Sequence, residues 1–320
     1  MLYDLEDLSG ARTLYEESLS ISRELGDKQG IALALANTAG VLADQGNLAP
    51  AASMYAESLA IRRELGNKSG VASALNTIAN LLEDQGELER ARVAAEEALA
   101  IYRELSETRS VASVQFRLGE IRAAQGDIAD ARTRHQEALA IREKLEELGT
   151  AANSKVALAR LSLQNGDPKT ADTLTRQAAG VFATQKAADD EAMALSVAAE
   201  SLLALGRMPE AREAMGRATT LARRSQNRLV RFAISISGAR VDAASGRMAE
   251  ARKTLESVSA EAASLGFRGY ELQARYALGD IEASFGDRAA GRARLAAVAN
   301  DAERFGYKTI AQSATKAAAR

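Results

Sequence analysis

Residue types that could perform chemistry are few in this sequence of 320 residues. It holds one histidine, His135, and no cysteine, which excludes a histidine dyad and a thiolate metal site. Adjacent carboxylates occur at Glu83 and Asp84, at Glu96 and Glu97, and at Asp189, Asp190 and Glu191. Paired carboxylates can act as general acid and base, but on helix surfaces they are usually just solvated. No phosphate-binding loop, nucleophile elbow or HExxH motif is present. We therefore expect no enzyme activity, no metal and no cofactor.

The elements that carry these residues follow a period of forty residues. Glycine recurs at Gly46, Gly86, Gly126, Gly166, Gly206, Gly246 and Gly286. Five residues after each glycine stand Ala51, Ala91, Ala131, Ala171, Ala211, Ala251 and Gly291. Seven residues before each glycine stand Ala39, Ala79, Gly119, Ala159, Ala199, Ala239 and Gly279. Columns of small residues in constant phase predict one supersecondary unit repeated along the chain.

Each unit is predicted to be two helices joined by a tight turn, and we name them helix A and helix B. Apolar residues over 31–42 and over 48–61 recur with helical spacing. The glycine lies between these segments, where a helix ends in a left-handed residue. Side chains suited to capping helix B follow four glycines, at Asn47, Asp127, Asp167 and Asp287. The prolines Pro50, Pro168 and Pro209 fall in the first turn of helix B, where a helix accepts them.

The same register assigns structural roles to the candidate chemical residues. His135 falls in a helix B column that faces the interior, so we expect it to be structural. Asp189, Asp190 and Glu191 fall where a helix A begins, so we expect them to cap that helix and complement its dipole.

Composition narrows the class of partner. The chain is 47% hydrophobic and 26% charged, with a net charge of -2, which argues against general nucleic-acid binding. Residues 1–160 carry a net charge of -7 and residues 161–320 one of +5. Either this difference is a chance variation in solvated surface charge, or it makes the molecule a dipole that steers a charged partner or favours head-to-tail stacking. The longest uncharged stretch, 29–43, is too short and too polar to span a bilayer. Without a signal-peptide pattern, we expect a cytoplasmic protein that does not bind membranes.

The repeated pattern resembles the tetratricopeptide repeat (TPR). A small residue in helix A, "QGN" or "QGD" at the turn (45–47 and 125–127), and an alanine in helix B carry the likeness. The usual unit has 34 residues; the units here have 40, with linkers such as "RELGDKQG" at 23–30. This is similar to the long-repeat arrays of LGN/Pins scaffold proteins and bacterial signalling proteins. The resemblance implies an all-α, right-handed α-solenoid superhelix of about eight helix-turn-helix units, with helix A on the concave face.

The array is expected to occupy the whole chain, 1–320, as a single domain. Residues 1–28 would form a partial first repeat with helix B only, 29–308 seven full repeats, and 309–320 a C-terminal capping helix. Because Met1 aligns with the last turn of a helix A, we expect a fragment of a longer protein. In similar bacterial proteins a kinase, cyclase or winged-helix domain precedes the array, which is what the resemblance implies.

Two columns of helix A are predicted to face the concave side, and we name the ten residues of these columns given below the concave set. The column six residues before the glycine contributes Asn80, Glu120, Arg160, Glu200, Arg240 and Asp280. The column ten residues before it contributes Asn76, Phe116, Ile236 and Tyr276. Asparagine amides can bond a peptide backbone, apolar rings can accept side chains, and arginines can hold carboxylates. The alternative is that Glu and Arg of neighbouring repeats pair with one another and only solubilise the wall.

The sequence therefore predicts a non-enzymatic scaffold that binds a protein or an extended peptide on its concave face. One alternative is the sensor region of a larger bacterial signalling protein, which would bind a small molecule or signal peptide. Another is self-association through the uncapped N-terminal helix B. A basic cluster, Arg223, Arg224, Arg228 and Arg231, is either a site for a phosphate or acidic segment or a group of solvated arginines.

Overall fold

The computed structural model describes residues 8–319, which form sixteen α-helices and no strand. The odd-numbered helices are α1 (Leu8–Leu25), α3 (Leu48–Glu64), α5 (Leu88–Glu104), α7 (Ile128–Lys144), α9 (Pro168–Gln185), α11 (Met208–Ala222), α13 (Met248–Leu265) and α15 (Arg288–Arg304). The even-numbered helices are α2 (Lys28–Asp44), α4 (Lys68–Asp84), α6 (Thr108–Ala124), α8 (Leu148–Gln164), α10 (Ala188–Ala204), α12 (Arg228–Ala244), α14 (Arg268–Phe285) and α16 (Lys308–Ala318). The even-numbered helices are the predicted A helices and the odd-numbered ones the predicted B helices. The partial helix A expected at the start of the chain lies outside the described residues.

The turn from helix A to helix B has the predicted left-handed glycine in six of seven repeats. The φ angle is +83° at Gly46 and +82° at Gly86, for example. Gly286 is the exception, with φ -135° and ψ -134°, so the glycine column does not predict its conformation. Capping side chains follow the prediction at Asp127, Asp167 and Asp287, which accept backbone N–H groups. The prediction is wrong at Asn47, whose side chain makes no cap hydrogen bond.

A second left-handed position lies in each linker from helix B to helix A except the linker between α11 and α12. It is glycine at Gly26, Gly66, Gly266 and Gly306, all with positive φ. The same position is Ser106, Glu146 and Lys186 in three repeats, with φ of 56°, 57° and 57°. Side chains disfavour this conformation by about 1–2 kcal/mol, so packing of the flanking helices must hold these three residues in place.

The small-residue columns mark where helices A and B cross. Ala51, Ala91 and Ala131 are fully buried. Gly119 makes room for a larger neighbour, because a Cβ there would lie 2.7 Å from His135 Nε2. His135 is fully buried, as predicted for a structural residue. Small side chains on one helix therefore decide which side chains the facing helix can bury.

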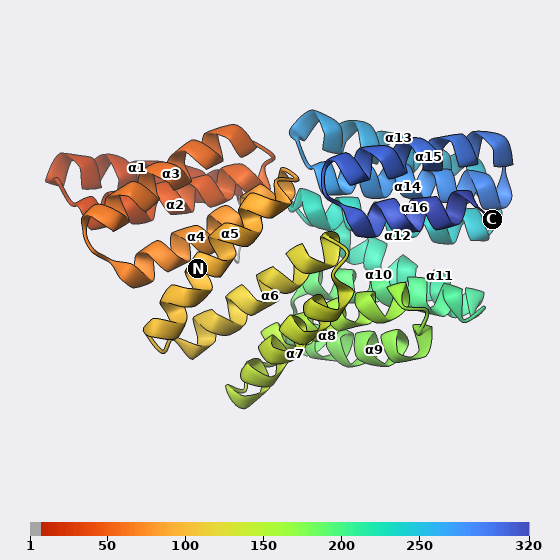
Figure 1. Cartoon of the computed structure of the whole chain (residues 1–320), viewed down its shortest axis with the longest axis horizontal. Coiled ribbons are helices and arrows are strands. Elements are labelled where there is room, and N and C mark those ends of the chain that lie inside the picture. Colours follow the sequence, from red (N-terminus) through yellow and green to blue (C-terminus); the bar gives the residue numbers. More distant parts are fainter. Residues whose placement is uncertain (1–7, 320) are drawn as a thin grey trace.

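The even-numbered helices form the inner layer of the array and the odd-numbered helices the outer one. Successive even-numbered helices pack on one another, as α10 does on α12 and α12 on α14, in addition to the packing within each hairpin. This packing bends the array into a superhelix, and we name the concave side lined by the even-numbered helices the channel. Figure 1 shows the hairpins following one another around the molecule, with the last helices returning beside α4 and α5.

The last helices close the superhelix against the first three hairpins. Helix α14 contacts α4, and α16 contacts α6. The turn glycines allow the approach, since Cβ atoms built on Gly86 and Gly126 would lie 3.0 Å from side-chain atoms of Arg268 and Lys308. One buried apolar cluster contains Leu48 and Tyr55 together with Phe232 and Phe267. We name this junction the seam.

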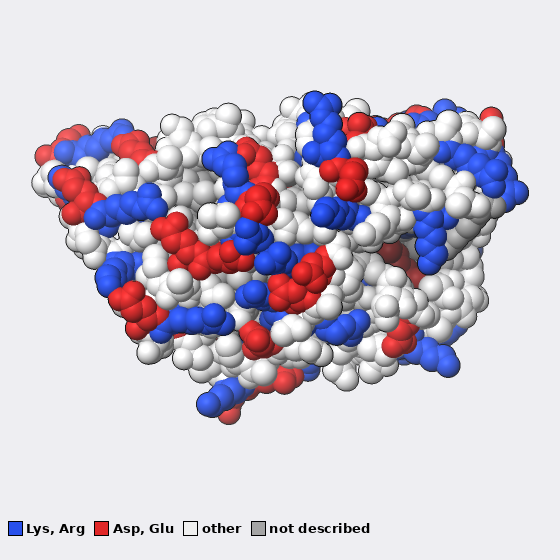
Figure 2. Space-filling view, viewed as in Figure 1, with Lys and Arg blue, Asp and Glu red and all other residues white. Residues whose placement is uncertain are grey.

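The charged side chains of the outer surface alternate in sign. Figure 2 shows Lys and Arg interspersed with Asp and Glu over one face, without a large patch of one sign. Pairs between successive repeats recur, as in Arg23 with Glu57 at 3.4 Å and Arg63 with Glu97 at 3.1 Å. Exposed pairs of this kind contribute about 0–1 kcal/mol each, so the fold rests on helix packing rather than on these pairs.

Candidate functional site

The inner wall of the channel carries nine of the ten residues of the concave set in a half-buried state. These are Asn76 and Asn80 on α4, Phe116 and Glu120 on α6, Arg160 on α8, Glu200 on α10, Arg240 on α12, and Tyr276 and Asp280 on α14. The tenth, Ile236, is 5% exposed and packs in the apolar cluster with Phe232 and Phe267. Apolar side chains of this cluster therefore cover Ile236, and it offers no surface to a ligand.

Glu120 is the centre of a charged group on α6, α7 and α8. Its carboxylate lies 3.1 Å from His135 Nε2, without hydrogen-bond alignment, and 3.8 Å from Arg160 Nη1. Burial raises the pKa of Glu120, but His135, Arg160 and Arg117 outweigh it and lower the pKa to about 2. Glu120 is therefore ionised across the physiological range and paired with Arg160 of its own chain.

Phe116 is held between two side chains of α7. Its ring meets the His135 ring edge-on, with centroids 5.1 Å apart, and Arg142 Cζ lies 4.8 Å from its centroid. Arg142 is itself buried and donates hydrogen bonds to Thr150 O at 3.0 Å and Ser154 Oγ at 2.8 Å. Burial lowers the pKa of Arg142 to about 10. The Phe116 ring is thus held by side chains on two sides, and its exposed part can offer an apolar surface to a ligand.

The C-terminal part of the wall has a second paired group. Arg240 Nη1 lies 3.3 Å from Asp280 Oδ2, and its guanidinium lies 5.2 Å from the Tyr276 ring centroid. On the neighbouring helix, Glu200 accepts a hydrogen bond from the Ser237 hydroxyl. The alternation of Glu and Arg along the predicted column therefore does produce pairs between neighbouring repeats. These pairs leave edges of Arg240 and Asp280 about a quarter exposed to the channel.

Two polar groups of α4 lack such partners. The Oδ1 atom of Asn76 is buried and accepts no hydrogen bond from any described residue. Asp84 forms neither a hydrogen bond nor an ion pair within the described part of the chain. Burial, with the charges of Glu83 and Asp44, raises the pKa of Asp84 to about 8, although Arg117 opposes the shift. A buried polar atom without a partner, such as Asn76 Oδ1, destabilises a fold by about 1–3 kcal/mol.

Three residues that lie close to the charged groups of the inner wall are not in the concave set. Arg117 on α6 pairs with Glu83 at 3.0 Å. Tyr270 on α14 and Tyr307 in the linker before α16 have pKa values raised first by burial and also by the charges of Glu83 and Asp84. The two tyrosines come from the far end of the chain and reach α4 only because the superhelix closes. No signal in the repeat pattern could have placed them there.

The basic cluster does not form one site. Arg228 pairs with Glu261 at 2.6 Å, and Arg231 donates a hydrogen bond to the Ser225 carbonyl at 3.4 Å.

The acidic residues at the start of α10 do not cap it as predicted. Asp189 accepts a hydrogen bond from the Ser225 hydroxyl at 2.8 Å, and the N-cap residue of α10 is Ala187. The prediction that Asp189, Asp190 and Glu191 lie in the first turn of a helix A is correct, but the predicted side-chain cap is absent.

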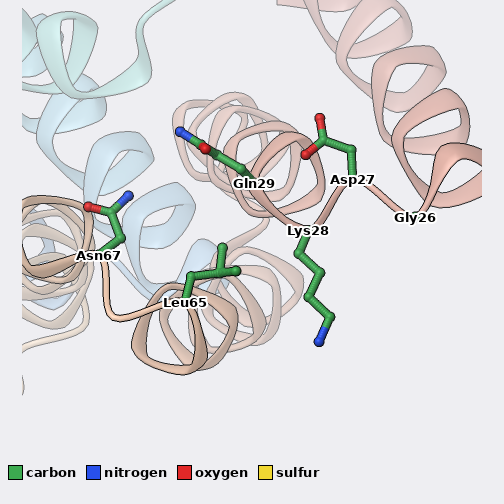
Figure 3. Close-up of a pocket in the computed structure, with 6 residues that line it drawn as sticks. All are labelled: Gly26, Asp27, Lys28, Gln29, Leu65 and Asn67. Atoms are coloured by element: carbon green, nitrogen blue, oxygen red, sulfur yellow. The ribbon is translucent and has the colours of Figure 1, made fainter.

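A hollow of about 550 Å³ lies outside the channel, between two linkers of the first repeats. Figure 3 shows its lining residues, with the Asp27 carboxylate and Lys28 ammonium pointing in different directions from one linker and Leu65 and Asn67 on the other. These groups do not converge on one point, so we assign no ligand to it. Over residues 8–319 we find neither a cluster of three potential metal ligands nor a helix both long and apolar enough to cross a bilayer.

Comparison with known proteins supports the repeat type. A family model described as the MalT-like TPR region matches residues 3–144. No curated protein matches the sequence. The repeat pattern, the family model over residues 3–144 and the shared fold together support a repeat of the tetratricopeptide type.

Solved structures share the fold over nearly the whole chain. A Rap protein in complex with competence and sporulation factor has a TM-score of 0.74 at 15% identity, covering 96% of this chain and 91% of that one. The Rap conjugation gene regulator of plasmid pLS20, in complex with a peptide, has a TM-score of 0.70 at 13% identity, covering 87% and 75%. The apo quorum sensor NprR from B. thuringiensis has a TM-score of 0.60 at 13% identity, covering 94% and 84%.

Proposed function

We propose that this tetratricopeptide repeat protein is a non-enzymatic scaffold that binds an extended peptide, or a segment of a partner protein, in the channel lined by its even-numbered helices. The observation that carries the proposal is the continuity of the inner wall. Six successive even-numbered helices, α4 to α14, each present a half-buried polar or aromatic side chain of the concave set. Such a wall can satisfy the backbone and the side chains of an extended chain at regular intervals.

The chemistry of the wall defines the ligand that we expect. Asn80 offers an amide donor and acceptor for a peptide backbone. The Phe116 ring, which meets His135 edge-on, and the Tyr276 ring, which contacts Arg240, offer apolar surfaces. Arg160 is 39% exposed, and among the described residues it pairs only with Glu120, at 3.8 Å, so a ligand carboxylate can compete for it. Two of the solved proteins with this fold, the two Rap structures, are complexes, and one of their ligands is a peptide, which supports the same mode of binding.

The test is a titration of peptides from a random dodecapeptide display library against the parent and channel variants. Asn80→Ala, Arg160→Met and Tyr276→Ala should each weaken binding by about 5–30-fold, the range that corresponds to about 1–2 kcal/mol, with helical content unchanged. Arg212→Glu, an exposed residue of the outer helix α11, is the matched control and should bind as the parent does. Equal binding by all three channel variants would refute the proposal.

A second candidate function is self-association through the N-terminal edge. Leu14, Ile21 and Leu25 of α1 are 45%, 56% and 77% exposed. Their counterparts one repeat later include Met54 and Ile61, which pack against the cluster of the preceding hairpin. The edge of α1 therefore resembles a repeat interface that no described residue covers. A second copy of the chain would bury this edge.

The sensor alternative remains a proposal about the same channel. A short signal peptide or a small molecule would use the same inner wall, and the size of the ligand separates the two ideas. Saturable binding of a peptide of a few residues, rather than of a dodecapeptide, would favour a sensor role.

A further inference from the structure

The hairpins give the array two edges, because the turns from helix A to helix B lie at one end of the helices and the linkers from helix B to helix A at the other. At the seam these edges meet. Leu265, at the end of α13, covers the turn at Gly46, where a Cβ would lie 3.1 Å from its side chain. Phe305, one repeat later, packs against the buried cluster that contains Leu88. The fold therefore already uses a contact in which apolar residues of the linker edge pack on the turn edge.

The position that Leu265 and Phe305 occupy is also apolar in the first four repeats, where it is exposed. We name its four leucines the linker set; they are Leu25, Leu65, Leu105 and Leu145, with exposed fractions of 77%, 44%, 37% and 38%. The two repeats between these groups carry Gln185 and Ser225 at this position. The linker set is therefore one continuous row along the linker edge. It begins beside the exposed edge of α1, since Leu25 lies one helical turn after Ile21.

The turn edge is covered in the first repeats and free in later ones. At the seam Gly46 and Gly86 are buried, and the leucines two positions after them, Leu48 and Leu88, are 5% and 3% exposed. Cβ atoms built on the later turn glycines Gly166, Gly206 and Gly246 would meet no neighbouring atom within 4 Å. The apolar residues two positions after these three glycines are half-buried, and we name them the turn set; they are Pro168, Met208 and Met248.

We propose that the linker set of one copy of this chain packs on the turn set of a second copy, as Leu265 packs on the turn at Gly46 within one chain. The two sets are the unused parts of the same two edges whose other parts meet at the seam. A second copy therefore offers each edge the kind of surface that it already contacts inside the molecule. The inference rests on the self-association candidate, to which it adds the second surface, and it is independent of peptide binding in the channel.

Charge favours the same arrangement of the two copies. The linker set lies in the half of the chain that has a net charge of -7, and the turn set lies in the half that has one of +5. Opposite net charges draw the linker edge of one copy toward the turn edge of another and disfavour the approach of two like halves. The contact is thus head-to-tail. Because it joins two different surfaces, each copy keeps one free set, and association continues into a ring or an open chain of copies.

Mixing two variants tests the pairing of the two surfaces. Leu65→Glu with Leu105→Glu places charges in the linker set and keeps the turn set. Met208→Glu with Met248→Glu does the reverse, at the first residues of α11 and α13, where the helix dipole favours a negative charge. Each double variant alone should associate at least about tenfold more weakly than the parent in sedimentation velocity, because every contact would then use one charged surface. An equimolar mixture should form dimers and no larger species, because one intact surface remains on each kind of chain.

The mixture also separates a lost surface from a lost fold, because a chain that does not fold cannot restore association to its partner. Circular dichroism checks the helical content of each variant. The single variants Leu105→Glu and Met208→Glu replace a double variant that loses helical content. Val93→Glu, on the outer face of α5, is the matched control and should associate as the parent does.

Three outcomes would overturn the pairing. The first is a mixture that stays monomeric although the parent associates and both variants keep their helical content. The second is undiminished association of either double variant alone, which would leave association to the α1 edge. The third is a parent that is monomeric at all protein concentrations, which would overturn the self-association candidate as well. Binding of library peptides in the channel is measured separately, so its failure would count against the proposed function and not against this pairing.

Discussion

Tyr307 donates a hydrogen bond of 3.1 Å to the carbonyl oxygen of Glu83, which precedes it by 224 residues. The same carbonyl accepts the Gly86 amide at 3.0 Å, so the tyrosine binds to the turn that ends α4. A Cβ on Gly86 would lie 3.3 Å from the Tyr307 ring. The glycine therefore serves two purposes, since it ends a helix in a left-handed conformation and admits a distant ring. The forty-residue repeat pattern predicts the end of the helix at this glycine, but it does not predict the contact with the distant ring.

Stability should depend on pH through Asp84. Its pKa is raised from 3.8 to about 8 in the folded chain by burial, Glu83 and Asp44. A carboxyl that holds its proton when folded and loses it when unfolded favours folding at low pH, and this contribution is lost as the pH rises through about 8. The free energy of unfolding should therefore fall between pH 5 and pH 8 in the parent and fall less in Asp84→Asn. Urea titrations at the two pH values measure this, with exposed Glu303→Gln as the control. Parallel behaviour of parent and Asp84→Asn would contradict the prediction.

Replacing Glu146 by glycine should stabilise the protein. Glu146 has φ +57° in a linker whose counterpart Gly66 has φ +65°. Relief of the left-handed conformation, about 1–2 kcal/mol, exceeds the entropy that glycine adds to the unfolded chain, about 0.5–1 kcal/mol. The net gain should be about 0.5–1 kcal/mol by chemical denaturation. Gly66→Ala is the reverse control, since nothing lies within 4 Å of its new Cβ and only the backbone conformation opposes it. A Gly66→Ala variant as stable as the parent would contradict this prediction.

A methyl group at Gly291 should destabilise the crossing of α14 and α15. A Cβ there would lie 2.8 Å from both Ala283 Cα and Gly279 O, and backbone atoms cannot move aside as a flexible side chain can. Gly291→Ala should lower the free energy of unfolding by about 1–3 kcal/mol. Gly216→Ala in α11, with open space at its Cβ, should instead raise it by up to about 1 kcal/mol. Thermal and urea unfolding of the two variants should thus move in opposite directions.

Self-association through α1 should show as a dependence of sedimentation velocity on protein concentration. Ile21→Glu places a charge on the exposed edge and should abolish the dependence without loss of helical content, because Ile21 is 56% exposed in the single chain. Val93→Glu, at a similarly exposed residue of α5, should leave it unchanged. If the parent remains a monomer at all protein concentrations, the prediction of self-association through α1 is wrong.

The order of helices in this protein follows from the sequence alone, because each local signal repeats in phase. A turn glycine such as Gly126, a cap such as Asp127 and a small crossing residue such as Ala131 act within a few residues of one another. Their effect does not depend on the rest of the chain, so the hairpins and the buried state of His135 could be predicted. The half-buried state of Glu120 and Arg160 follows from the same register, since neighbouring A helices are adjacent in both sequence and space.

Only the tertiary structure decides the closure and the part of the site that depends on it. Small rotations between successive hairpins add up over the array, and their sum brings Arg268 and Tyr307 to the turn at Gly86. No local pattern encodes that sum, which is why Tyr270, Tyr307 and the raised pKa of Asp84 could not be foreseen. The same limit applies to Ile236, because the cluster that buries it includes Leu48 and Tyr55 from the opposite end of the chain. Whether a residue is buried depends on all the elements that pack against it. Here some of those elements come from the far end of the sequence.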